Sequence, residues 1–208
     1  MFPLDIAEKT RTSAQTIHGS EILKMVTEHY INTQRTRDGD GKVLTLFYAA
    51  LWASILLCSL VAGLLLGFAI VVMPGIATLS DKEFLSAFKV MDATIQNRQP
   101  IFMLVWVGSI VSVVLMLCLG TSQLNGRPLH MMWLASGLYL VAVQAPTIRF
   151  NIPLNNAVQA LTLESMSVTE LAAARSQFEG SWNRWNRLRT CAGIASVSIL
   201  LSLQILSC

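Results

Sequence analysis

The chain has 208 residues, of which 53% are hydrophobic and only 13% are charged. Charged residues are absent from several long blocks, which is typical of integral membrane proteins and excludes a soluble bundle, whose helices carry polar stripes. The formal net charge of +3 is spread along the chain and provides no basic stripe. We therefore expect a lipid bilayer, and no nucleic acid, among the partners.

Residues 1–42 are predicted to form an N-terminal tail. Within it, Ser13–Tyr30 has apolar residues at a partly helical spacing, which predicts a surface helix that can lie in the headgroup region. The following segment, Arg37–Gly41, contains two glycines and two aspartates and predicts a turn before the first span.

Four apolar blocks predict four membrane-spanning helices, because each approaches or exceeds the roughly 20 residues that cross a bilayer. The expected spans are residues 43–73, 100–122, 128–150 and 188–208. Residues 43–208 are thus predicted to be one all-α membrane domain, a four-transmembrane-helix bundle. Met73-Pro74-Gly75 is expected to end the first span, since proline cannot continue the hydrogen-bond ladder. Gly63 and Gly67 have the four-residue spacing of closely packed helices and predict packing inside the bundle.

The connections after the first and third spans are both predicted to be helical and to lie on one face of the bundle. Ser80–Glu83 and Ser167–Glu170 each match the capping box that opens a helix. The second of these helices is expected to continue toward the fourth span. In the first, Phe84 and Phe88 belong to the apolar face, and Asp92 is expected on the opposite, polar face.

The orientation in the membrane depends on the flanks of the first span, because Lys and Arg are nearly balanced over the other connections. Arg35, Arg37 and Lys42 precede this span and outweigh Lys82, which follows it. Positive charge concentrates on the cytoplasmic side, so we expect a cytoplasmic N-terminus.

Asparagine, arginine and tryptophan gather beside the third and fourth spans. On one helix Trp182, Trp185, Asn186 and Arg189 can share a face. The topology brings this face to the mouth of the bundle that also receives Asn97, Arg149, Asn151, Asn155 and Asn156. Polar residues at membrane depth are candidates for function. The same residue types also serve as interfacial anchors and helix caps, and both interpretations remain open.

Four motifs stand out in the membrane domain: Met73–Ile76, Met91–Asn97, Thr147–Asn156 and Trp182–Arg189. With these motifs the sequence resembles the anthrone oxygenase-like family of small membrane proteins, and the resemblance extends from Phe47 to about Leu203. It implies four transmembrane helices. In members with an assigned role, it also implies oxidation of a polycyclic anthrone to an anthraquinone by molecular oxygen, without a metal or flavin.

Under this resemblance, a (poly)aromatic substrate would lose a proton to give an enolate, which N–H donors would stabilise. Asp92 is then the candidate base, although a solvated helix face is an equal alternative for it. Asn97 and Arg189 are the other candidate catalytic residues. The candidate substrate-binding residues are Arg149, Asn151, Asn155, Asn156, Trp182, Trp185 and Asn186.

We expect no metal, haem or other cofactor. The histidines are His18 and His29 in the tail and His130 at the start of the third span, and no Cys or His pair has ligand spacing. The alternative to an oxygenase is a non-enzymatic carrier, assembly factor or scaffold whose Asn, Arg and Trp residues form a structural clamp. An enzyme requires a pocket of several hundred cubic ångströms beside these residues, whereas a clamp would pair them internally and leave no cavity.

Overall fold

The computed structural model describes the backbone of residues 4–206 and the side chains of residues 25, 27–34 and 39–206. In this range the chain is predominantly helical and contains no strand, which confirms the all-α prediction. The chain divides into two compact units, Met1–Thr45 and Leu46–Cys208.

From Leu4 onward the first unit is helical and belongs to α1, which is assigned from Leu4 to Gly67. The predicted turn at Arg37–Gly41 is wrong, because the backbone there is α-helical. Glycine costs only about 1 kcal/mol in a helix interior relative to alanine, so two glycines weaken a helix without ending it. The apolar face predicted for Ser13–Tyr30 lies mostly outside the described side chains.

In the part of the chain that the structure describes, four helical segments are long and apolar enough to cross a membrane. They are Thr27–Ala77, Pro100–Gln123, Gly126–Gln159 and Val168–Leu206. Their number confirms the predicted four-span architecture, and they indicate a multi-pass membrane protein.

The first span continues through the proline that was expected to end it. The π-helix η1 (Phe68–Val72) follows α1, and α2 (Met73–Ala77) contains Pro74 in its first turn. The Met73 backbone N–H donates to the carbonyl of Phe68, five residues back, which is the wide turn of a π-helix. This wide turn lies directly before Pro74, so the ring does not meet the regular α-helical ladder with which it would clash.

The third span also contains π-helical turns. It consists of α5 (Gly126–Gly137), η2 (Leu138–Gln144), η3 (Thr147–Asn151) and α6 (Ile152–Gln159). Pro153 lies in the first turn of α6, as predicted, but α6 follows η3 without an intervening loop. Such π turns change the direction in which the following side chains point, and they are frequent at functional sites.

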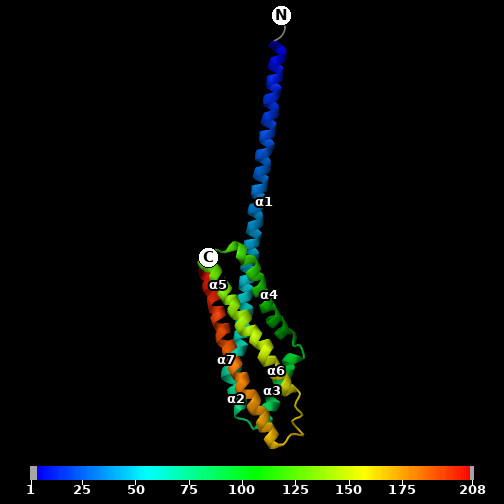
Figure 1. The fold of residues 1–208 in the computed structure, drawn as a ribbon, viewed down its shortest axis with the longest axis vertical. Helices are drawn as coiled ribbons and strands as arrows, with labels where there is room; N and C mark the ends of the chain where they lie inside the picture. The colour runs from blue at the N-terminus through cyan, green and yellow to red at the C-terminus, as the bar shows by residue number, and fades with distance from the viewer. Residues whose placement is uncertain (1–3, 207–208) are drawn as a thin grey trace. The chain divides into compact units, whose positions relative to one another are not determined.

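Helical connections meet at one end of the bundle. Helix α3 (Asp81–Gln96) starts with the predicted capping box, and the Ser80 hydrogen bonds lower the pKa of the Glu83 carboxyl. Helix α7 (Val168–Leu206) starts with the second capping box, in which the Ser167 hydroxyl donates to Glu170 at 2.7 Å. In Figure 1, α2, α3, α6 and the first half of α7 lie at the same end, which we call the α3 end. Its buried apolar side chains are Met73, Phe84, Leu85, Phe88, Val158, Leu163, Leu171, Phe178 and Trp182.

The close helix approaches are not at the glycines predicted from spacing. A Cβ atom added to Gly63 or Gly67 would meet no atom within 4 Å, so the prediction that they pack inside the bundle is wrong. A Cβ atom on Gly120 of α4 (Pro100–Gln123) would instead lie 2.7 Å from the Phe47 ring and overlap Met132. Glycine at this position therefore lets α4 approach both α1 and α5.

Candidate functional site

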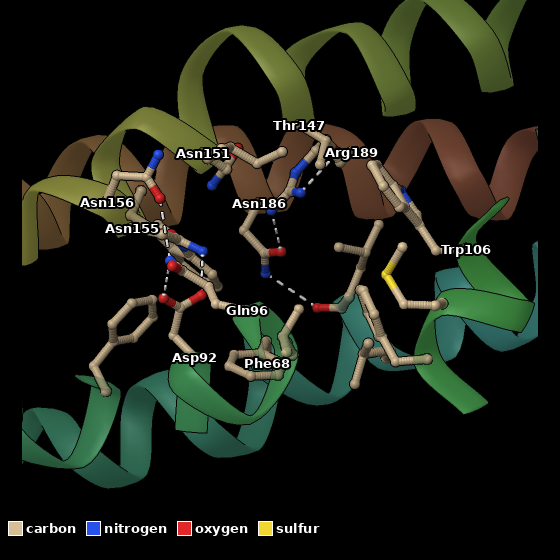
Figure 2. A pocket seen from close by; sticks show the side chains of 18 of the residues that line it. Phe68, Asp92, Gln96, Trp106, Thr147, Asn151, Asn155, Asn156, Asn186 and Arg189 are labelled. Carbon is tan, nitrogen blue, oxygen red and sulfur yellow. Dashed lines mark hydrogen bonds between the residues drawn. The ribbon is translucent and has the colours of Figure 1, made fainter. Parts of the chain in front are cut away.

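A cavity of about 370 Å³ lies inside the second unit, toward the α3 end. Its walls come from the end of α1, η1, α3, α4, η3, α6 and α7, and Figure 2 shows its polar side chains. The lining residues are Leu64, Leu65, Phe68, Phe88, Asp92, Ile95, Gln96, Arg98, Phe102, Met103, Trp106, Thr147, Asn151, Ile152, Asn155, Asn156, Trp182, Asn186 and Arg189.

Asp92 is 4% exposed and lines this cavity, so its expected place on a polar, solvated face is wrong. Three side-chain amides donate to its carboxylate. Asn155 Nδ2 lies 2.7 Å from Oδ1, and Gln96 Nε2 and Gln159 Nε2 lie 2.7 and 2.9 Å from Oδ2. Helix α6 packs against this face of α3, which buries the carboxylate and compensates its lost hydration with amide N–H groups.

Asn155 connects this carboxylate to an indole ring. Its Nδ2 donates to Asp92, and its Oδ1 accepts a hydrogen bond from Trp182 Nε1 at 2.8 Å. The Trp182 ring also meets Phe88 edge-on, with centroids 5.5 Å apart, and lies 5.7 Å from Phe68. The hydrogen bond and the ring contacts together hold the Trp182 indole in place as an aromatic wall of the cavity.

Arg189 lies on α7 and is 5% exposed. Its Nη1 donates to Thr147 Oγ1 at 2.9 Å and its Nη2 donates to Asn186 Oδ1 at 3.1 Å. Asn186 in turn donates to the carbonyl of Leu65 at 3.0 Å, which ties this group to α1. The Nε–H of Arg189 has no partner among the described residues, and the ion pairs found there all belong to Arg175. The guanidinium is therefore held by neutral groups and is not neutralised by a carboxylate.

Asn151 is the least satisfied polar side chain of the cavity. It is 2% exposed, and neither its Oδ1 nor its Nδ2 has a hydrogen-bond partner among the described residues. It ends η3, the π-helical turn that also contains Thr147, and Figure 2 shows it beside the Arg189 and Asn186 group. Buried amides are normally hydrogen-bonded, so two free polar atoms beside a cavity indicate space for a ligand.

The structure brings most, but not all, of the predicted site residues to the cavity. Those that line it are Asp92, Asn151, Asn155, Asn156, Trp182, Asn186 and Arg189. Asn97 caps the C-terminus of α3 and is exposed, and Arg149 is also exposed. Trp185 stacks on Phe150, with centroids 3.8 Å apart and ring planes at 7°, and does not line the cavity.

Several residues that line the cavity or hydrogen-bond to its wall were not predicted from the sequence. Thr147 was part of a family motif but had no assigned role. Gln159 follows Asn155 by four residues, so helical spacing was a usable signal for it. Arg98, in the connection between α3 and α4, has a φ of 58°, which no sequence pattern indicates. The aromatic residues Phe102 and Trp106 looked like ordinary parts of an apolar span.

Among the described residues, no three His, Cys, Asp or Glu side chains are grouped so that they could hold a metal ion. His130 is exposed, and its Nδ1 lies 2.7 Å from the carbonyl oxygen of Gly126, at the start of its own helix.

Comparison with known proteins identifies the family. The sequence model of the family described as Anthrone oxygenase matches residues 88–199, which is more than half of the chain. No curated protein and no solved structure matches the chain. The matched range contains most of the cavity wall, from Phe88 of α3 to Arg189 of α7. The resemblance noted in the sequence is thus confirmed, and the chain belongs to the anthrone oxygenase family.

Proposed function

We propose that the protein oxidises a lipophilic (poly)aromatic substrate with molecular oxygen inside the cavity. The observation that carries this proposal is a cavity of about 370 Å³ that is lined by aromatic rings and by a buried Arg and a buried Asn with unpaired hydrogen-bonding groups. Small-molecule sites are commonly about 300 to 1,000 Å³, mostly apolar, with a few convergent polar groups. The family supports an anthrone as the substrate class.

The proposed reaction starts with the acidic methylene carbon of the anthrone. Asp92 accepts one of the two methylene protons. A carboxylate has about four acceptor positions, and three amide donors occupy three of them, so about one position remains for this proton. The electron pair of the broken C–H bond delocalises onto the anthrone oxygen as an enolate. The Nε–H of Arg189 and the Nδ2–H of Asn151 are free to donate to this oxygen, and such preorganised donors stabilise developing charge.

Molecular oxygen is the oxidant. The enolate passes electrons to O₂, and one oxygen atom forms a bond to the former methylene carbon. That carbon loses its second hydrogen and becomes a carbonyl, and the other oxygen atom takes up this hydrogen and the proton held by Asp92 and leaves as water. The balance is one anthrone and one O₂ giving one anthraquinone and one water. The protein groups bind, orient and move a proton in this scheme.

A non-enzymatic carrier or scaffold is the second candidate, and the Asp92 network favours it. Asp92 and Asn155 are hydrogen-bonded to each other, Asp92 also accepts from Gln96 and Gln159, and Asn155 also accepts from Trp182, as expected of a clamp between α3, α6 and α7. A clamp does not account for the cavity or for the unpaired atoms of Asn151 and Arg189. The oxygenase proposal accounts for both, with the clamp as the support of the site.

The test is oxygen uptake and anthraquinone absorbance with anthrone and the purified protein in lipid nanodiscs, after subtraction of spontaneous oxidation in empty nanodiscs. Arg189→Lys should lower kcat/KM about 100-fold, because an ammonium cannot reproduce the planar donor fork. Arg184→Lys, an exposed arginine on the same helix, should change the rate by less than about twofold. Wild-type protein that oxidises anthrone no faster than empty nanodiscs would refute the proposal.

We also propose an orientation and a division of the chain. The N-terminal tail, residues 1–42, lies in the cytoplasm, and residues 43–208 form the membrane domain. The basic residues before the first span support this orientation. With four spans, the α3 end then lies on the opposite side of the membrane, and a lipophilic substrate reaches the cavity from the bilayer.

A further inference from the structure

Arg189 lacks a counter-ion in a place where a charge is costly. It lies in a candidate membrane-spanning helix, it is 5% exposed, and it forms no ion pair with any described carboxylate. A buried charge normally has an oppositely charged partner, because burial removes its hydration. Thr147 and Asn186 provide dipoles but no negative charge, so the charge of Arg189 is unbalanced.

Asp92 does not supply the missing charge. Its carboxylate is held by the amides of Asn155, Gln96 and Gln159 and makes no ion pair with Arg189. Figure 2 draws Asp92 and Arg189 at separate ends of the polar side chains that line the cavity. No described carboxylate therefore balances the charge of Arg189, which leaves a ligand anion as its candidate partner.

The free atoms also indicate the shape of that anion. The free Nε–H of Arg189 can donate to one oxygen of a carboxylate, a group that guanidinium N–H donors bind well because donors and acceptors lie in one plane. Asn151 adds an unpaired amide that can donate to the same group. The remaining wall is largely apolar and aromatic, including Phe68, Trp106 and Trp182, and suits a flat hydrocarbon body.

We propose that the cavity selects aromatic carboxylates, with the carboxylate bound by Arg189 and Asn151 and the ring system packed against the aromatic wall. This inference rests on the cavity of the proposed function and names the ligand class of that same site. The carboxylate binds the donors that the proposed reaction offers to the enolate oxygen, so an aromatic carboxylate occupies the place of that oxygen. It requires no oxygen chemistry, so binding and oxidation are separable by experiment.

The experiment compares two ligands of nearly equal shape on the wild-type protein in nanodiscs at pH 7. Anthracene-2-carboxylate carries the charge, and anthracene-2-carboxamide is its neutral counterpart. Calorimetry or quenching of tryptophan fluorescence should give about tenfold tighter binding of the carboxylate, because hydrogen bonds to charged groups are stronger than neutral ones. Equal affinities for the two ligands would overturn the proposal.

Palmitate tests whether the carboxylate belongs to a lipid. It carries the same charged group on a flexible chain, and it should bind at least about tenfold more weakly than anthracene-2-carboxylate if the aromatic wall selects the ring system. Palmitate that binds as tightly as the aromatic acid would overturn the aromatic part of the proposal.

Two variants locate the site. Arg189→Gln should abolish the preference for the carboxylate. Asn151→Asp places a carboxylate of nearly the same shape beside Arg189, so it should exclude the ligand carboxylate while thermal stability is maintained or raised. Arg184→Gln, on the exposed side of α7, should keep the wild-type preference. Retention of the preference in Asn151→Asp would contradict the assignment, and its stability measurement shows that the variant is folded.

Failure of this inference is distinguishable from failure of the proposed function. Neither anthracene ligand has the methylene carbon of an anthrone, so the binding result does not depend on turnover. A protein that oxidises anthrone but binds both ligands equally would retain the oxygenase proposal and lose the carboxylate selectivity. A protein that prefers the carboxylate but does not oxidise anthrone would retain the binding site and its ligand class and lose the oxygenase proposal.

Discussion

Asn155 shows how one amide can connect two parts of a site. Its nitrogen donates to Asp92 on α3 and its oxygen accepts from Trp182 on α7, while the residue itself lies on α6. An amide has a donor and an acceptor side by side, which neither a carboxylate nor a hydroxyl provides in the same geometry. Asn155 therefore fixes the cavity wall, and Arg189 and Asn151 remain available for a ligand.

Asn155→Ala should destabilise the protein by about 1 to 3 kcal/mol, because it leaves the buried Trp182 N–H without a partner and removes a donor from Asp92. Asn156→Ala is the matched control, because the Asn156 side chain is exposed and accepts a single hydrogen bond, from Gln96 at 3.1 Å. The measurement is the thermal unfolding midpoint of each variant in nanodiscs, which we expect to be lower for Asn155→Ala than for Asn156→Ala. Equal stability of the two variants would show that Asn155 does not support the wall.

At the scale of helices, glycine matters where backbones approach and not where glycines are regularly spaced. Gly120 faces Phe47 and Met132, whereas Gly63 faces open space. The four-residue spacing of Gly63 and Gly67 indicates a smooth helix face but does not say which face meets another helix. That is decided by the rotation of each helix in the bundle.

Gly120→Ala should lower stability by about 1 to 3 kcal/mol, because the added methyl group overlaps Met132 and the Phe47 ring. Gly63→Ala should leave stability unchanged or raise it slightly, since alanine favours the helix and the methyl group meets nothing within 4 Å. Denaturation midpoints of the two variants provide the measurement. A stable Gly120→Ala protein would mean that α4 does not approach α1 and α5 so closely.

At the scale of the whole molecule, successive spans cross the membrane in alternating directions. The two long connections, between the first and second and between the third and fourth spans, therefore lie on one side of the membrane. Both connections contribute to the α3 end, through α3 and through residues 160–167 before α7. This arrangement places the hydrogen-bonded groups of the cavity toward one end of the bundle, where helix ends and π turns can supply polar groups.

Labelling of single cysteines in a cysteine-free background tests the proposed orientation. Ser165→Cys should react with a membrane-impermeant maleimide added from outside intact cells, and Asn125→Cys should react only after the cells are permeabilised, because the two connections lie on opposite sides of the membrane. Reaction of both from outside would contradict four spans. The reverse pattern would place the N-terminus outside.

Local sequence patterns were sufficient for the four spans and the two capping boxes. Each depends on residues that are close in the chain: a run of apolar side chains, or a Ser and Glu three residues apart. The family motifs were likewise readable, because they are contiguous segments. The turn at Arg37–Gly41 and the helix end at Pro74 were wrong because single residues change helix stability by amounts that neighbouring structure can offset.

The sequence by itself determined an all-α, four-span membrane protein and predicted a set of candidate site residues at one end of the bundle. Only the tertiary structure decided which of them share a cavity. Helical spacing placed Asp92 with the polar residues, but packing of α6 on α3 buries it. Trp185 shares α7 with Trp182 and Arg189, yet it stacks on Phe150 outside the cavity. These outcomes depend on the π turns and on the rotation of each helix against its neighbours, which are set by contacts between residues far apart in the chain.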